Sequence, residues 1–150
     1  MTVLSASVDL DLPPEQAWAL LTDWQRQGEW IPLTDVTVTG GPPAGLGTKL
    51  SGRTGIGPLG FTDRMEIDVW DWPRRFEVAH LGALVTGRGV FIIDERPGGG
   101  SRVTWQERLE STGVRRVIDP LGALPGRAML AVALRRLGRL AAQPPTRPAA

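Results

Sequence analysis

Six successive segments of this sequence alternate apolar and polar residues with a period of two, and short connections rich in Gly, Pro or Asp separate them. A two-residue period places alternate side chains on opposite faces of a β-strand, and short connections join neighbouring strands as antiparallel hairpins. The segments cover residues 35–40, 47–55, 61–70, 75–83, 87–96 and 101–110. This pattern restricts the chain to folds that are built around an antiparallel meander.

The segments on either side of the meander predict one more strand and three helices. Residues 2–12 alternate like a first strand, and residues 13–32 change to a helical period that predicts a helix and then a shorter one. Residues 121–143 predict a long amphipathic helix, with Arg135, Arg136 and Arg139 opposite its apolar face. We therefore expect an α+β fold with a seven-stranded antiparallel sheet, two short helices after the first strand and a long C-terminal helix. The expected domain spans residues 1–143, and residues 144–150 are expected to form a flexible tail.

Composition excludes several classes of site. The 150 residues include no Cys and one His, so disulfides, thiolate metal sites and multi-histidine metal sites are excluded, and no cofactor is expected. The net charge of +1 predicts no nucleic-acid partner. Without a signal-like N-terminus or a long apolar run, we expect a cytoplasmic protein with no stable membrane insertion, as a monomer or homodimer.

One carboxylate interrupts an apolar row. In residues 101–110, Glu107 shares its face with Val103, Trp105 and Leu109, although an unpaired charge that faces a core costs several kcal/mol. The same period places Asp63 beside Met65 and His80 beside Val78 on the inner faces of two other strands. Three ionisable groups therefore share one face of the sheet, while strand register, which the sequence leaves open, decides whether they meet.

Each of these three residues has an alternative interpretation. Glu107 either pairs with an arginine or lies at the wet end of the sheet, or it contacts a ligand in a cavity. His80 is either a hydrogen-bonded core imidazole or a group that binds a ligand or transfers a proton. Asp63 either faces solvent at a hairpin end or joins the inner face. The phase of the strand around residues 90–93 also stays open, with Phe91 and Ile93 favoured as the inward residues.

The order of the predicted elements resembles the SRPBCC superfamily, also called START-like or polyketide cyclase/dehydrase-like, whose fold is the helix grip. The stretch "LPPEQAWALLTDWQRQGEWIP", with Trp18 and Trp30, is similar to the entry helices of the family, and "SRVTWQERLE" is similar to its last strand. The resemblance covers nearly the whole chain. It implies a curved sheet around the C-terminal helix, and between them a mostly apolar cavity that binds lipids, sterols, polyketides or plant hormones. Aromatase/cyclase members line this cavity with Arg, Tyr and His, whereas this sequence has no Tyr and a single His.

On this basis we expect the chain to bind a hydrophobic small molecule that is lipid-like or polyketide-like. One alternative is a polyketide cyclase or dehydratase that uses Glu107, Asp63 and His80, and another is a partner-binding domain without a ligand that uses the arginine face of the last helix. The candidate ligand-binding residues are Trp30, Leu50, Asp63, Met65, His80, Phe91, Trp105, Glu107, Met129 and Ala133.

Overall fold

A computed structural model describes residues 1–110 and 123–143. Its strands are β1 (Thr2–Leu10), β2 (Thr34–Gly40), β3 (Lys49–Thr54), β4 (Phe61–Asp71), β5 (Arg75–Leu81), β6 (Thr86–Glu95) and β7 (Ser101–Leu109). Its helices are α1 (Pro14–Leu21), the 3-10 helices η1 (Trp24–Glu29) and η2 (Gly57–Leu59), and α3 (Ala123–Ala141). The expected tail, residues 144–150, and the expected first two residues of the last helix lie outside the described residues.

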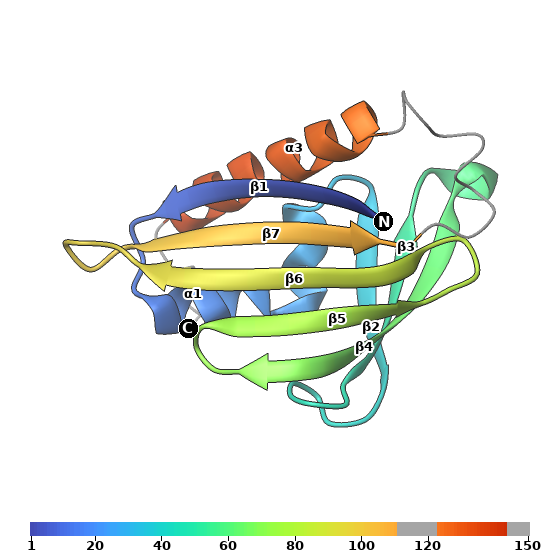
Figure 1. The fold of residues 1–150 in the computed structure, drawn as a ribbon, viewed down its shortest axis with the longest axis horizontal. Helices are drawn as coiled ribbons and strands as arrows, with labels where there is room; N and C mark the ends of the chain where they lie inside the picture. Colours follow the sequence, from blue (N-terminus) through green and yellow to red (C-terminus); the bar gives the residue numbers. More distant parts are fainter. Residues whose placement is uncertain (111–122, 144–150) are drawn as a thin grey trace, which may run out of the picture.

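The seven strands form one antiparallel sheet in the order β1-β7-β6-β5-β4-β3-β2. Strands β2 to β7 therefore lie in chain order, as a meander requires, and β1 closes the far edge against β7. Figure 1 shows that β2 and β3 run steeply across the direction of β1 and β7, so the sheet is strongly twisted and curved. The fold is helix-grip-like, as the order of the elements predicted.

The helices cover the inner face of the sheet. In Figure 1, α1 lies behind the strands and α3 runs along β1. The side chains of α3 that are buried follow the helical period, and they are Leu130, Ala133, Leu134 and Leu137. Gly126 permits the close packing, because a Cβ at this position would lie 2.6 Å from Cδ1 of Leu4 on β1. No helix within the described part of the chain is long and apolar enough to cross a membrane.

Aromatic side chains form the centre of the core. Phe76, Phe91 and Trp105 occupy directly paired positions on β5, β6 and β7. Their rings stack, with centroids 4.7 Å apart for Phe76 and Phe91 and 5.1 Å apart for Phe91 and Trp105. Trp18 of α1 meets the edge of this stack at Phe76, with centroids 5.3 Å apart. The stack also settles the open phase of β6, because Phe91 lies on the inner face.

A bulge in β4 changes which residues face inward. The two-residue period predicted Val69 on the inner face with Ile67, but the register shifts between these two residues where β4 pairs with β5. A bulge inserts one extra residue and so reverses the alternation beyond it. Trp70 consequently points to the core and packs on Trp18, with ring centroids 4.7 Å apart. The prediction for Val69 was wrong for this reason.

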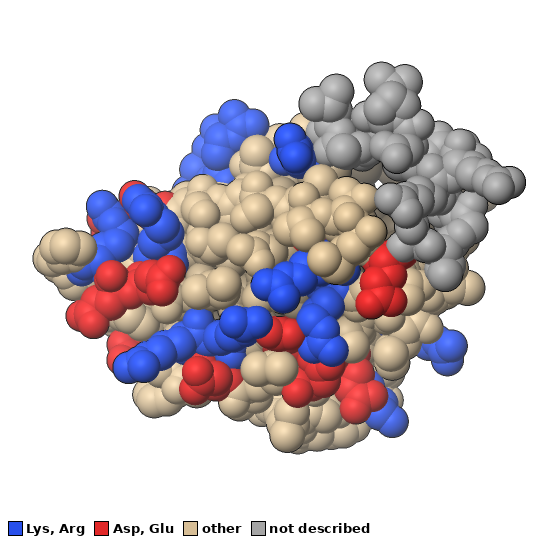
Figure 2. Space-filling view, in the orientation of Figure 1, with Lys and Arg blue, Asp and Glu red and all other residues tan. Residues whose placement is uncertain are grey.

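The outer face of the sheet carries its own charge network. Glu77 of β5 is 7% exposed and receives hydrogen bonds from Arg75 and from Arg88. Burial alone would raise the pKa of Glu77, but the hydrogen bonds and charges of these arginines lower it below its ordinary value. Figure 2 shows acidic and basic side chains interleaved over the middle of this face, beside a region over β1 and β7 without charged groups. The buried carboxylate on this face is thus paired with arginine.

Candidate functional site

A cavity of about 280 Å³ lies between the sheet and the helices. Strands β3 to β7 supply one wall, while β1, η1 and the residues after it, β2 and α3 supply most of the rest. Its lining is mostly apolar, including Ile31, Val36, Leu50, Met65, Phe76, Val78, Phe91, Leu109, Met129 and Leu130. Such a cavity holds an apolar molecule by removing its surface from water.

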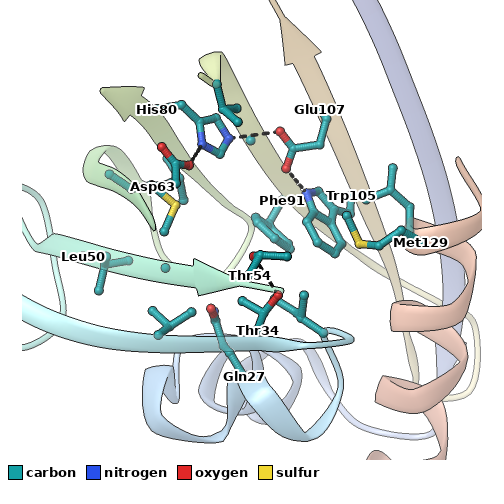
Figure 3. Close-up of a pocket in the computed structure, with 18 of the residues that line it drawn as sticks. Gln27, Thr34, Leu50, Thr54, Asp63, His80, Phe91, Trp105, Glu107 and Met129 are labelled. Carbon is teal, nitrogen blue, oxygen red and sulfur yellow. Dashed lines mark hydrogen bonds and ion pairs between the residues drawn. The ribbon is translucent and has the colours of Figure 1, made fainter. Parts of the chain in front are cut away.

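His80 connects two carboxylates at one end of the cavity. Its Nδ1 lies 2.5 Å from Oδ2 of Asp63, and its Nε2 lies 3.1 Å from Oε2 of Glu107. The other oxygen of Glu107, Oε1, accepts a hydrogen bond of 2.7 Å from the indole Nε1 of Trp105. Figure 3 shows this network running across the sheet from Asp63 through His80 to Glu107 and Trp105. We call these four residues the polar network.

Strand register brings the network together. His80 of β5 pairs directly with Met65 of β4, so Asp63, two residues before Met65, lies diagonally across from it on the same face. Glycines then leave room for the carboxylates. A Cβ at Gly89 of β6 would lie 3.1 Å from Oε1 of Glu107, and one at Gly82 would lie 2.8 Å from Oδ1 of Asp63.

The network holds His80 as an imidazolium near neutral pH. Burial alone would lower the pKa of His80, but hydrogen bonds and opposite charge from Asp63 and Glu107 outweigh it and raise this pKa from 6.5 to about 9. The side chains of Asp63, His80 and Glu107 are each no more than 13% exposed. Among the described residues, Oδ1 of Asp63 has no hydrogen-bond partner.

These positions bear on the alternative interpretations of the three ionisable residues, while contact with a ligand stays a prediction. Asp63 is 8% exposed, so the expectation that it faces solvent at a hairpin end was wrong: its carboxylate is held inside by His80. Among the described residues, Glu107 has His80 and Trp105 as partners and no arginine, and it lines the cavity. His80 is hydrogen-bonded, as the core interpretation required, and it also lines the cavity.

Most of the candidate ligand-binding residues lie in the cavity wall. Those that line it are Leu50, Asp63, Met65, His80, Phe91, Trp105, Glu107 and Met129. Trp30 and Ala133 are fully buried core residues outside the lining. Trp30 lies behind the wall, with its ring centroid 5.8 Å from that of Trp105 and its Nε1 without a hydrogen-bond partner among the described residues.

The sequence interpretation missed the part of the wall that η1, β2 and β3 provide. Trp24 and Gln27 of η1 line the cavity, as do Thr34 of β2 and Thr54 of β3. Figure 3 shows Gln27, Thr34 and Thr54 across the cavity from His80. The only signal for Thr54 was its place on the inner face of its strand. No signal marked Gln27, a polar residue in a segment that was read only as a short helix.

The arginine face of α3 is exposed at Arg135, Arg136 and Arg139. These side chains lie opposite the buried face of the helix and are not part of the cavity lining. Binding of a partner at this face stays a prediction.

Comparisons with known proteins agree with the fold. Residues 1–143 match a sequence family described as polyketide cyclase/dehydrase and lipid transport. Among curated proteins, no sequence matches this chain significantly.

Solved structures extend the likeness to the three-dimensional fold. XoxI from Bacillus cereus is 20% identical with a TM-score of 0.71, covering 93% of this chain and 95% of that one. A protein from Thermobifida fusca is 20% identical with a TM-score of 0.71, covering 94% and 93%. The Aha1 dimer from Colwellia psychrerythraea is 12% identical with a TM-score of 0.67, covering 92% and 94%. At these identities the likeness shows a shared fold.

Proposed function

The chain belongs to the polyketide cyclase/dehydrase and lipid transport family, and from this premise we propose that it binds a hydrophobic small molecule in the cavity between the sheet and α3. The observation that supports the proposal is the cavity itself, which combines a mostly apolar wall with the polar network at one end. Apolar pockets with few convergent polar groups are typical of small-molecule sites, because burial supplies affinity and the polar groups orient the ligand.

The size of the cavity supports a compact ligand. Its volume of about 280 Å³ lies just below the usual range for ligand pockets, roughly 300 to 1,000 Å³. A ligand that buries about 200 Å² of apolar surface gains roughly 5 kcal/mol before association costs. We therefore expect modest affinity for compact molecules such as bicyclic aromatics or medium-length chains.

A fluorescence titration with N-phenyl-1-naphthylamine tests the proposal. This neutral probe brightens in apolar surroundings, and we expect a saturable increase with the wild-type protein. Thr54→Trp places a large ring on a cavity-lining position and should weaken binding by about tenfold or more. Thr37→Trp is the matched control, because Thr37 is exposed and lies outside the lining. Equal binding by the two variants, or no saturable binding by the wild type, would contradict the proposal.

A second candidate function is an enzyme that moves a proton next to a carbonyl group, as a cyclase or dehydratase requires. One observation favours it: Asp63, His80 and Glu107 form one hydrogen-bonded network beside the cavity. Glu107 would take a proton from the carbon next to a bound ketone, and the positive charge of the nearby His80 would stabilise the negative charge of the resulting enolate.

Exchange of hydrogen for deuterium in 1-tetralone, followed by NMR in D₂O, tests this second function. The wild-type protein should accelerate exchange at the carbon next to the carbonyl, and Glu107→Gln should remove the acceleration. Exchange at the rate of buffer alone excludes proton transfer to this substrate, while leaving the binding function intact.

A further inference from the structure

Among the described residues, the polar side chains that line the cavity have all but one of their hydrogen-bond donors in use, whereas their acceptors are partly free. The polar network is the first example of this difference between donors and acceptors. Both ring nitrogens of His80 are occupied by carboxylates, and the indole N–H of Trp105 is occupied by Oε1 of Glu107. The indole N–H of Trp24 likewise donates to the backbone oxygen of Pro43. None of these donors is available to a ligand.

The threonine pair across the cavity is similar. Thr34 has one hydroxyl hydrogen, which it donates to the backbone oxygen of Pro32 at 3.0 Å. In its 3.0 Å contact with Thr54 it must therefore accept, so the hydroxyl hydrogen of Thr54 is also in use. The oxygen of Thr54 keeps its capacity to accept.

Gln27 completes the wall opposite the network. Its amide Nε2 donates to the backbone oxygen of Leu21 at 2.9 Å, which orients the amide so that its oxygen points into the cavity (Figure 3). One amide hydrogen of Gln27 is then the only spare side-chain donor among the lining residues that the structure describes.

Acceptors remain at both ends of the cavity. A carboxylate offers about four lone-pair sites, and each oxygen of Glu107 accepts one side-chain bond from the residues that the structure describes. The network also carries net negative charge, because two carboxylates surround one imidazolium. The described lining contains no Lys or Arg that would balance a bound anion.

We propose that the cavity binds apolar ligands whose polar end is an uncharged hydrogen-bond donor, such as an alcohol or a phenol, and disfavours ligands that end in a carboxylate. A hydroxyl group donates to the free acceptors of Glu107 or Gln27. A carboxylate cannot donate and meets like charge at Asp63 and Glu107. It also loses its water without gaining a free cation, because the imidazolium of His80 is already paired with these two carboxylates. This specificity rests on the binding function proposed above and adds the chemistry of the ligand's polar end.

Calorimetric titration at pH 7 with naphthalene, 2-naphthol and 2-naphthoate tests the specificity on one ring system. At this pH a phenol, with a pKa near 10, stays protonated, whereas the carboxylic acid is ionised. We expect 2-naphthol to bind more tightly than naphthalene, and 2-naphthoate to bind roughly tenfold or more weakly than 2-naphthol. Glu107→Gln should reduce the difference in affinity between 2-naphthol and 2-naphthoate, because it removes one negative charge. Glu95→Gln, at an exposed position of β6, should leave this difference in affinity unchanged.

The outcomes separate the two proposals. If 2-naphthoate binds as tightly as 2-naphthol, the donor specificity is overturned while the cavity-binding function stands. If none of the three compounds binds, the binding function fails and the specificity fails with it. Asp63→Asn replaces Glu107→Gln if the latter does not fold. The order of the three affinities for the wild-type protein tests the donor specificity without either variant.

Discussion

The buried imidazolium of His80 makes the stability of this protein fall between neutral and alkaline pH. The pKa of His80 is raised to about 9 in the folded chain, against 6.5 when unfolded. Below pH 6.5 both states bind the proton, so the stabilisation is fully present. Between pH 6.5 and about 9 only the folded state keeps the proton, and stability falls by about 1.4 kcal/mol per pH unit. The loss is complete above about pH 9 and amounts to about 3 kcal/mol.

Urea unfolding at pH 6, 8 and 10 measures this loss, and subtracting the same series for His80→Gln cancels the other titrating groups. The difference in the free energy of unfolding between wild type and variant should be largest at pH 6 and smallest at pH 10. NMR titration gives the pKa directly, because the chain has a single histidine. A titration midpoint at or below 6.5 would refute the reasoning, whatever the unfolding data show.

Removal of one carboxylate tests the origin of the raised pKa. Glu107→Gln leaves His80 with Asp63 as its charged partner, so the pKa of His80 should fall and its NMR midpoint should move toward 6.5. Stability at pH 7 should decrease by roughly 1 to 2 kcal/mol, since the imidazolium loses a charged hydrogen bond. An unchanged midpoint in Glu107→Gln would mean that this carboxylate does not hold the proton on His80.

Two further substitutions test the packing around the cavity. Trp105→Phe keeps a ring in the aromatic stack but removes the hydrogen bond to Glu107. It should lower the free energy of unfolding in urea by about 1 to 3 kcal/mol. The control Trp72→Phe, at an exposed position, should lower it by less than about 0.5 kcal/mol. Gly126→Ala should lower the melting temperature although alanine favours helices, because the new methyl group would lie 2.6 Å from a β1 side chain. In the control Gly138→Ala the new methyl group would have its closest contact at 3.4 Å, so this variant should be neutral or stabilising. If Gly126→Ala and Gly138→Ala raised the melting temperature equally, the tight packing of α3 on β1 would be contradicted.

The two-residue period predicted the inner face of the sheet well because alternation is a local property of each strand. It placed Asp63, His80 and Glu107 on one face without any knowledge of their neighbours. Their hydrogen bonds depend on how β4, β5 and β7 are aligned, and register is set by long-range pairing that the sequence does not display. The bulge near Ile67 is unmarked by Gly or Pro, so the reversal beyond it could not be predicted either.

The helical wall of the cavity was harder to predict. Residues Trp24–Glu29 form a 3-10 helix, whose period of three residues per turn differs from the α-helical period that the pattern suggested. Gln27 is 7% exposed because its side chain donates to the backbone oxygen of Leu21, the last residue of α1. A polar side chain that is buried in order to satisfy a backbone group leaves no periodic signal.

The nitrogen-15 NMR signals of His80 and the indole N–H signal of Trp105, followed during titration with 2-naphthol, test most directly whether a ligand binds in the cavity beside the polar network. Both side chains line the cavity and belong to the network. Saturable shifts of both sets of signals, at the same concentrations that give the calorimetric binding curve, are the predicted result. A complete calorimetric binding curve that leaves both sets of signals in place would contradict it, because the ligand would then bind elsewhere on the protein.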